Sequence, residues 1–424
     1  MAREMKDSGV KWIGEIPENW QTKKLKYVAY TVSETGLNGV KIGLENIESK
    51  TGKFVHTDTE YDGVGQIVHK DDIVYGKLRP YLCKAWKAEF ECNAVGDFYV
   101  FRCNNLIDSA FIQKVLVSEK FNEVCTAATY GTKMPRVSLD YINSVLLPLP
   151  PFFEQQAIAD FLDGKCAEID GVLADLEAEV KTLSEYKKSI ISEVTTQGLN
   201  QNVKKKQSGI DWVGNIPAHW QVVPFRSYVV ERAEKNLGGR NKNLLALSFA
   251  LGVTRYADKK YNMDRVKEDF SGYQIVHEKD LVLSPNDIIK GSIFVSEYKG
   301  CISPMYRVFS NYDPETYNLY YLSYHLRTKE SGRKFFYIAR GLIGEILDNG
   351  KYVTRRMSVS QQDLLKFKVL LPPIEEQNEI VRYLDEKCAS IEQSLADKQT
   401  QIETLKSYKA SLIYEYVTGK KQVI

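Results

Sequence analysis

Residues 149–166 of this chain read LPPFFEQQAIADFLDGKC, and residues 371–388 read LPPIEEQNEIVRYLDEKC. The second stretch repeats the first at an offset of 222 residues and keeps both prolines, the Glu-Gln pair and the Leu-Asp-x-Lys-Cys ending. Because proline suits the first turn of a helix, each stretch predicts a helix start. The sequence therefore predicts two copies of one long helix.

Apolar residues recur every seven positions along each predicted helix, with Lys398 interrupting the second row. The expected inter-helix packing residues are Leu162, Ile169, Leu173, Leu176, Leu183, Ile190, Leu384, Ile391, Leu395, Leu405 and Leu412. A heptad pattern of this kind predicts one narrow apolar seam per helix, which suits a helix partner. We expect the two helices to pair antiparallel; two independent amphipathic helices on separate domains are the alternative.

Two further pairs of stretches extend the repeat. SGVKWIGEIPENWQ (8–21) recurs as SGIDWVGNIPAHWQ (208–221), and QIVHKDDIV (66–74) recurs as QIVHEKDLV (274–282). We call residues 8–21 and 208–221 the junction segments. The offset grows from 200 to 208 and then 222, which indicates insertions in the second half. The second junction segment directly follows the first helix, so we expect the first one to lie beside the second helix.

The repeat predicts an α+β protein with a circular, approximately two-fold internal arrangement. Two globular α/β domains are expected to be separated by a long antiparallel two-helix coiled coil. The predicted parts are an N-terminal junction segment that completes the C-terminal copy (1–21), a first variable domain (22–147), a central helix (148–199), a linker with the second junction segment (200–221), a second variable domain (222–369) and a C-terminal helix (370–424).

Composition narrows the class of protein. At 424 residues, 43% hydrophobic and 26% charged, the chain resembles ordinary multidomain globular proteins. No apolar run approaches the ~20 residues of a membrane span, and the start lacks a signal-peptide core, so we expect a cytoplasmic protein. The seven cysteines and five histidines show no metal-ligand spacing.

The net charge of +2 is unevenly distributed. Residues 222–369 contain 24 basic and 16 acidic side chains, whereas residues 22–147 contain 16 and 15. A polyanionic partner is therefore expected for the variable domains, mostly for the second one.

The order of Trp-x-Gly-x-Ile-Pro-x-x-Trp, variable domain, Leu-Pro-Pro-x-x-Glu-Gln and heptad helix, repeated twice, resembles the specificity (S) subunits of Type I restriction-modification systems. The resemblance covers nearly the whole chain. It implies a non-catalytic subunit whose two target recognition domains each read half of a bipartite, asymmetric site in double-stranded DNA. It also implies that the helices bind two methyltransferase (M) subunits, and that restriction (R) subunits join the full complex. S-adenosylmethionine, ATP and Mg²⁺ would belong to those partners, with no cofactor on this chain.

Two stretches of the first variable domain are candidates for DNA contact. Residues 75–81, YGKLRPY, combine basic and aromatic side chains with Gly and Pro at a predicted strand end, and residues 128–136 read ATYGTKMPR. The candidate residues are Lys77, Arg79, Tyr81, Tyr130, Lys133 and Arg136. Such residues contact phosphates or base edges in DNA readers, although a solvated turn is the alternative.

The second variable domain offers a matching loop, SPNDIIK (284–290), and a dense positive patch further on. Its candidate residues are Asn286, Lys290, Arg340, Lys351, Arg355 and Arg356. Asn286 suits adenine, and Lys290 suits a phosphate or guanine. Along the helices, Glu177, Glu179, Lys181 and Glu185 are candidates for a partner surface, with a solvated face as the alternative.

Two other classes of function stay open. Asp287, Glu297 and Lys299 loosely resemble a metal-dependent nuclease pattern. A protein-binding scaffold is the other alternative. An amino-methyltransferase is not expected, because Leu149 replaces the polar residue that holds the target amine, and no Gly-Lys-Ser/Thr phosphate loop occurs.

Overall fold

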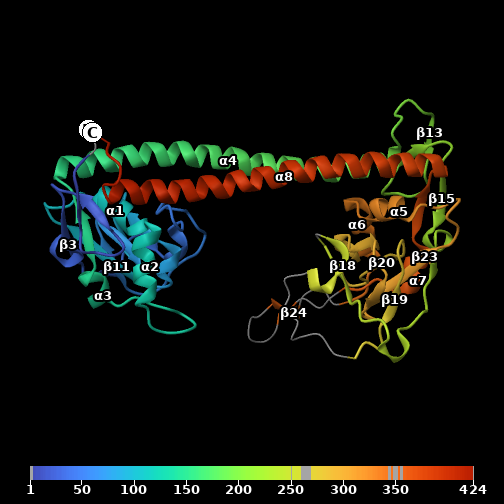
Figure 1. Ribbon diagram of the computed structural model, residues 1–424, viewed down its shortest axis with the longest axis horizontal. Helices are drawn as coiled ribbons and strands as arrows, with labels where there is room; N and C mark the ends of the chain where they lie inside the picture. The colour runs from blue at the N-terminus through green and yellow to red at the C-terminus, as the bar shows by residue number, and fades with distance from the viewer. Residues whose placement is uncertain are drawn as a thin grey trace. The chain divides into compact units, whose positions relative to one another are not determined.

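The computed structural model describes residues 3–249, 251–258, 269–341, 345–346, 352–353 and 357–423, with side chains at all of these except 345–346 and 352–353. Contacts divide the chain into two compact units. Unit 1 comprises Met1–Ala178 with Lys398–Ile424, and unit 2 comprises Glu179–Asp397. The units are described separately below (Figure 1).

Unit 1 is built around an antiparallel sheet in the order β4-β11-β8-β9. A second sheet in the order β5-β7-β10-β6 includes one parallel pair, β10 with β6. The strands are β1 (Met5–Asp7), β2 (Glu15–Pro17), β3 (Gln21–Lys24), β4 (Ala29–Thr31), β5 (Thr35–Gly36), β6 (Lys41–Ile42), β7 (Gly65–Val68), β8 (Ile73–Gly76), β9 (Ala85–Lys87), β10 (Cys92–Ala94), β11 (Phe98–Cys103) and β12 (Leu146–Leu149). The short helices are η1 (Leu25–Tyr27), η2 (Leu44–Asn46), η3 (Pro80–Leu82), α1 (Ser109–Val117), α2 (Glu119–Ala127) and α3 (Leu139–Ser144). Val74, Trp86 and Phe98 lie in the core between the sheets.

Unit 2 repeats the first topology, because its main antiparallel sheet has the order β16-β23-β20-β21. Its strands are β13 (Lys205–Gln207), β14 (Asn215–Pro217), β15 (Gln221–Pro224), β16 (Val229–Glu231), β17 (Leu245–Ser248), β18 (Gly252–Arg255), β19 (Gln274–Val276), β20 (Leu281–Leu283), β21 (Ile293–Val295), β22 (Gly300–Ile302), β23 (Arg307–Asn311), β24 (Glu345–Ile346), β25 (Tyr352–Val353) and β26 (Lys368–Leu371). Its short helices are η4 (Phe225–Ser227), η5 (Leu237–Gly239), η6 (Tyr256–Asp258), η8 (Ile288–Lys290), α5 (Leu319–Leu326), α6 (Lys329–Ile338) and α7 (Gln361–Lys366). The mixed α/β content predicted from the sequence is confirmed.

Two long helices, α4 (Phe152–Gln197) and α8 (Ile374–Val417), contact each other in both units (Figure 1). In unit 1 the rings of Phe161 and Tyr416 lie 4.6 Å apart, and Lys409 donates to Asp170 at 2.5 Å. In unit 2 Lys187 pairs with Glu392. The residue numbers rise along α4 as they fall along α8, so the helices run antiparallel where they touch.

Seven of the eleven predicted heptad residues of α4 and α8 are buried, and the other four are half-buried. Leu162, Ile169, Leu173, Ile190, Leu384, Ile391 and Leu412 are buried, whereas Leu176, Leu183, Leu395 and Leu405 are half-buried. Lys398, which interrupts the row, is also half-buried. Leu176, Leu183, Leu395 and Leu405 sit in the middle part of each helix.

The repeated tryptophan of each junction segment is held by the repeated glutamate at the start of a long helix. Trp20 Nε1 donates to Glu154 at 2.9 Å, and Trp220 Nε1 donates to Glu376 at 2.8 Å. Both indoles are fully buried. In unit 1 Tyr414 of α8 also donates to the carbonyl of Trp12 at 3.1 Å, so the first junction segment lies on the end of the second helix, as expected.

The glutamine that follows each glutamate serves as a buried clamp. Gln155 accepts from Asp108 N at 2.7 Å and donates to the carbonyls of Leu106 and Pro150. Gln377 makes the same three bonds in unit 2, to Asn318 N, Thr316 O and Pro372 O. The Glu-Gln pair therefore fixes each variable domain to its helix start. Among the described residues, no helix combines the length and apolarity needed to cross a membrane.

Candidate DNA interface

The two candidate stretches of unit 1 lie against each other. We call residues 75–81 the strand-end loop and residues 128–136 the helix-end loop, because they follow β8 and α2. Arg79 N donates to the carbonyl of Pro135 at 2.8 Å, and Val137 N donates to the carbonyl of Lys77 at 3.1 Å. Tyr130 and Arg136 exchange two backbone hydrogen bonds of 3.0 Å. The structure thus brings together side chains that are more than 50 residues apart in the sequence.

One carboxylate anchors this pair of loops. Asp97 accepts from Arg136 Nε and Nη2 at 2.9 and 2.8 Å, and Lys77 Nζ lies 3.9 Å from it. The hydrogen bonds from Arg136, opposed by partial burial, lower the pKa of Asp97 below its usual range. Asp97 can neutralise only one of the two cations; it binds Arg136 through both oxygens and leaves Lys77 only partly paired.

Arg79 differs from these two residues. It is exposed, and its backbone is left-handed, with φ 53° and ψ 65°. An arginine in this conformation costs about 1–2 kcal/mol, and such strain is retained where surrounding contacts impose it. Arg79 and the exposed Lys133 have no ion-pair partner among the residues that the structure describes. With Tyr81 and Tyr130, which are 49% and 60% exposed, they form a basic and aromatic surface.

Unit 2 uses the same construction with different side chains. Its strand-end loop (284–290) follows β20, and Val359 N donates to the carbonyl of Pro285 at 3.1 Å. Arg340 and Ser358 exchange backbone hydrogen bonds of 2.9 and 3.0 Å, as Tyr130 and Arg136 do in unit 1. We call residues 339–341 and 357–358 the helix-end loop of unit 2. The repeat offset rises from 210 between Tyr130 and Arg340 to 222 between Arg136 and Ser358, so part of its increase falls here.

The described candidates of unit 2 occupy this loop pair. Asn286 is half-buried and Lys290 is exposed, with Lys290 Nζ 3.7 Å from Asp287. The side chain of Arg340 is 81% exposed and lies 3.6 Å from Asp363. Lys351, Arg355 and Arg356 lie outside the described residues.

Sequence reasoning missed the exposed face of α6 in unit 2. This helix packs beneath η8, since a Cβ on Gly332 would meet the carbonyl of Ile289 at 2.6 Å. Phe336 and Tyr337 are 42% and 80% exposed beside the exposed Arg333. Exposed aromatic side chains next to arginine suit base stacking. The signal in the sequence was the run RKFFYIAR (333–340), in which a single helix face cannot bury three aromatic residues.

The loose nuclease pattern does not assemble into a site. Asp287 lies beside Lys290, whereas Glu297 accepts from Tyr320 OH at 2.6 Å. Within the described ranges, no group of three or more His, Cys, Asp or Glu side chains is placed to hold a metal ion. Asp287 and Glu297 lie beyond opposite ends of the β20–β21 pair, because Leu283 pairs with Ile293 and Leu281 with Val295.

Glu177, one of the predicted partner-surface residues, pairs with a residue of the other long helix. It accepts from Lys406 Nζ at 3.0 Å across the two helices of unit 1. Glu179, Lys181 and Glu185 are exposed.

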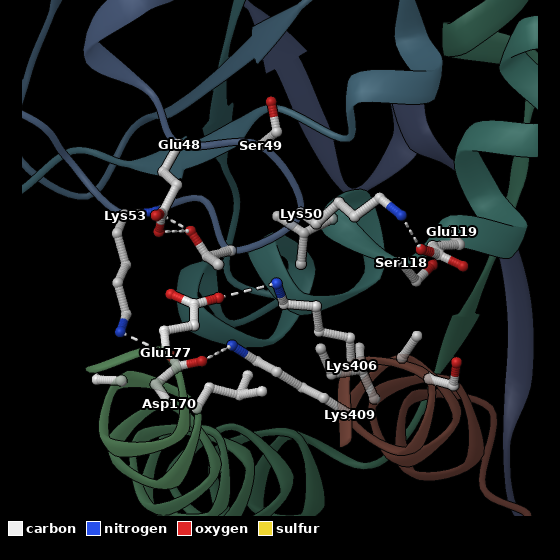
Figure 2. Close-up of a pocket in the computed structure, with 17 residues that line it drawn as sticks. Glu48, Ser49, Lys50, Lys53, Ser118, Glu119, Asp170, Glu177, Lys406 and Lys409 are labelled. Carbon is white, nitrogen blue, oxygen red and sulfur yellow. Dashed lines mark hydrogen bonds and ion pairs between the residues drawn. The ribbon is translucent and has the colours of Figure 1, made fainter. Parts of the chain in front are cut away.

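Glu177 also lines a cleft of unit 1 of about 670 Å³, shown in Figure 2. The cleft lies between the 48–53 loop, the α1–α2 turn and the two long helices. Four lysines line it, and each is paired: Lys50 with Glu119, Lys53 and Lys409 with Asp170, and Lys406 with Glu177. The cleft is therefore close to neutral and does not extend the basic surface.

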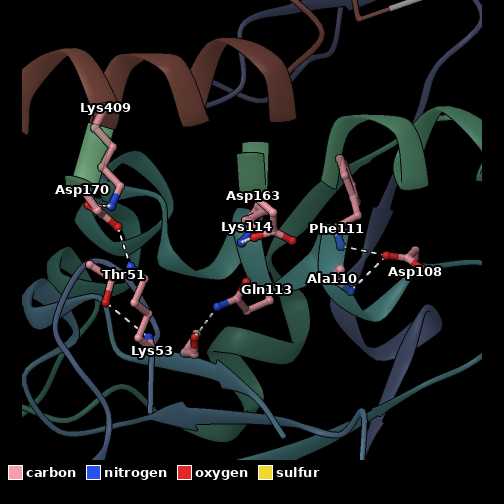
Figure 3. A network of polar contacts seen from close by, with 11 residues as sticks. Thr51, Lys53, Asp108, Ala110, Phe111, Gln113, Lys114, Asp163, Asp170 and Lys409 are labelled. Atoms are coloured by element: carbon pink, nitrogen blue, oxygen red, sulfur yellow. Dashed lines mark hydrogen bonds and ion pairs between the residues drawn. The ribbon is translucent and has the colours of Figure 1, made fainter. Parts of the chain in front are cut away.

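The polar contacts around this cleft attach the first variable domain to the helices (Figure 3). Burial acts to raise the pKa of Asp170, but hydrogen bonds from Lys409 and Lys53 outweigh it and hold the pKa below its usual range. Lys114 of α1 pairs with Asp163 of α4. Asp108 caps α1 by accepting from Ala110 N and Phe111 N, each at 2.9 Å.

Comparisons of the whole chain with known proteins find similarity to one family. The family model described as "Type I restriction modification DNA specificity domain" matches residues 252–404. The putative type I restriction enzyme MjaX specificity subunit of Methanocaldococcus jannaschii is 23% identical over 448 residues, covering 97% of this chain and 96% of that protein. The EcoDI specificity subunit of Escherichia coli is 27% identical over 206 residues, covering 45% and 46%.

Solved structures agree in fold. A structure described as the basis of complex assembly and conformational transition of the type I R-M system superposes with a TM-score of 0.70 at 18% identity, covering 96% of this chain and 99% of that one. The HsdS subunit from Thermoanaerobacter tengcongensis gives a TM-score of 0.52 at 19% identity, covering 96% and 98%. Over nearly its whole length the chain is similar to the specificity subunits of type I restriction-modification enzymes, and residues 252–404 match their family model.

Proposed function

We propose that this chain is the non-catalytic DNA-recognition subunit of a type I complex and that each unit reads one half of a bipartite, asymmetric site. The supporting observation is that the strand-end loop and the helix-end loop contact each other in the same way in both units. The backbone bonds that recur in both units present Tyr130 and Lys77 in unit 1 but Arg340 and Pro285 in unit 2. One scaffold with different side chains at equivalent positions suits two different half-sites.

The finer architecture belongs to the same proposal. The two variable domains are separated by α4 and α8, which act as an antiparallel coiled coil, and the two copies are related by an approximate two-fold axis. A helix of 46 residues is ~69 Å long. A pair of such helices has the length to set a fixed gap between half-sites about one turn of DNA apart.

The proposed partners follow from the similarity to type I specificity subunits. Two methyltransferase subunits bind along the helices, restriction subunits join the larger complex, and double-stranded DNA is the ligand. S-adenosylmethionine, ATP and Mg²⁺ act in those partners, and this chain has no cofactor of its own. The complex works in the cytoplasm.

Arg79→Ala tests the reading role, with Lys26→Ala as a matched control, because Lys26 is also exposed in unit 1 but away from the two loops. The full chain is assembled with its methyltransferase partner, and the methylated sites in genomic DNA are sequenced. We expect Arg79→Ala to relax one base position in a single half-site, by about 1–3 kcal/mol of discrimination. The thermal midpoint should stay unchanged, because Arg79 has no ion-pair partner among the described residues.

Two outcomes would contradict the proposal. If wild-type complexes methylate a contiguous palindrome, the two units do not read separate half-sites. If the assembled complex shows no salt-dependent affinity for DNA, the scaffold alternative is favoured instead.

A further inference from the structure

A second basic surface lies in unit 2, away from the strand-end loop. A pocket of about 370 Å³ is bordered by the second junction segment, α6, α7 and the start of β26. Three lysines line it: Lys334 from α6, Lys366 from α7 and Lys368 from β26. All three are exposed, and none has an ion-pair partner among the residues that the structure describes.

The acidic side chains of the pocket do not cancel these charges. Asp363 accepts from Ser360 Oγ at 2.6 Å and lies 3.6 Å from Arg340, so its charge is already engaged. Asp211 is exposed and is the other carboxylate of the lining. Three lysines against one available carboxylate leave an excess of positive charge.

The fold does not require lysine at these positions. The repeat places Val124, Ser144 and Leu146 of unit 1 at the sites of Lys334, Lys366 and Lys368, because the helix caps Ser118 and Ser138 match Thr328 and Ser360. All three counterparts are uncharged, yet α2, α3 and β12 form in the same way as α6, α7 and β26. The lysines are therefore a property of unit 2, where the basic excess of the sequence is concentrated.

The pocket is also continuous with the proposed DNA surface. Asp363 lines the pocket and contacts Arg340, which belongs to the helix-end loop. Lys334 stands on α6, whose exposed residues Arg333 and Tyr337 flank that loop. The lysine pocket adjoins Arg340 on the same surface. A polyanion that binds Arg340 therefore also reaches the pocket.

We propose that Lys334, Lys366 and Lys368 form a backbone clamp that binds phosphates of duplex DNA flanking the half-site read by unit 2, with no counterpart in unit 1. The inference rests on the proposed function and adds an asymmetry to it. Unit 2 makes more contacts with DNA phosphates than unit 1. A larger share of the contribution of unit 1 to DNA affinity therefore comes from its two loops. Each phosphate neutralised by lysine adds about 0.9 to the slope of log affinity against log salt concentration.

The test uses the full chain assembled with its methyltransferase partner and a random-sequence 40-base-pair duplex, so the recognised sequence need not be known. The variant Lys334→Gln/Lys366→Gln/Lys368→Gln is compared with Lys204→Gln/Lys205→Gln/Lys206→Gln, which removes equal charge from exposed linker positions. We expect the first variant to reduce the salt slope by about two to three and the affinity near 0.1 M salt by roughly a hundredfold. The linker variant should change both much less.

The other possible results of this experiment contradict either the clamp or the proposed function. A steep wild-type slope that the lysine variant leaves unchanged, or that both variants reduce equally, overturns the clamp while the proposed function stands. Loss of co-purification with the methyltransferase partner, with DNA affinity retained, overturns it in favour of an acidic protein segment. A wild-type complex without salt-dependent binding contradicts the proposed function itself.

Discussion

At the scale of single residues, the Glu-Gln pair that begins each long helix is the most informative feature. Glu154 and Glu376 accept from buried tryptophans, and Gln155 and Gln377 clamp the chain before α1 and α5. A buried indole N–H without an acceptor costs about 1–3 kcal/mol. This requirement gives a physical reason why Trp, Glu and Gln occur in both copies of the repeat.

Glu376→Ala tests this contact, and Glu375→Ala is its control. Glu376 is half-buried and accepts from Trp220 and His219, whereas Glu375 is the preceding, exposed residue of the same helical turn. We expect Glu376→Ala to lower the free energy of unfolding by about 1–3 kcal/mol and Glu375→Ala to change it by less than about 0.5 kcal/mol. Urea denaturation followed by tryptophan fluorescence measures both. Equal changes in the two variants would show that the hydrogen bond from the Trp220 indole is not the source of the lost stability.

The ion pair beneath the loops of unit 1 makes stability depend on pH. Because the pKa of Asp97 is lowered in the folded protein, chiefly by hydrogen bonds from Arg136, its contribution is present above the unfolded pKa of ~4. That contribution is lost as the pH falls through the lower folded value. The thermal midpoints of wild type and Asp97→Asn should therefore differ at pH 7 and converge toward pH 3. A difference that stays constant with pH would contradict this.

At the scale of elements, the two long helices illustrate what a heptad seam stabilises. Ile402 of α8 is 3% exposed, whereas Val172 of α4 is 50% exposed on the outer side. Removing a buried isoleucine side chain costs about 2–5 kcal/mol through lost transfer energy and a cavity. Ile402→Ala should accordingly lower the helix-pair melting midpoint in circular dichroism, and Val172→Ala should not. Similar shifts for both variants would mean that the seam contributes no more than an outer position.

At the scale of the whole molecule, the two variable domains are fastened to the helices by different forces. Unit 1 uses ion pairs, Lys114 with Asp163 and Lys53 with Asp170. At the position equivalent to the Lys114–Asp163 pair, unit 2 uses a neutral donor, because Tyr324 donates to Asp385 at 2.7 Å. Elsewhere in unit 2, Tyr321 donates to the carbonyl of Thr195 at 3.0 Å. Salt screens ion pairs at partly exposed sites far more than hydrogen bonds from a neutral hydroxyl.

Hydrogen exchange in low and high salt should reveal this difference. We expect 1 M NaCl to increase amide exchange in α1 and the 48–53 loop of unit 1 but to leave α5 of unit 2 nearly unchanged. Sodium sulfate at equal ionic strength is a useful comparison, because it also screens charge while strengthening apolar burial. Equal increases in both units would contradict an ionic attachment of the first domain.

The two long helices and the resemblance to specificity subunits could be predicted from sequence alone. Those features are local or periodic: proline before a heptad row, and one Trp-x-Gly-x-Ile-Pro-x-x-Trp segment beside each helix. The surroundings of each candidate side chain, in contrast, depend on the folded chain. Arg79, Lys77 and Arg136 look alike as basic residues in two loops, but the fold puts Asp97 beside two of them and leaves the third exposed in a left-handed backbone. The lysines of unit 2 come from α6, α7 and β26, and no sequence spacing joins them, because a charge is free or paired according to neighbours that the folded chain brings from elsewhere.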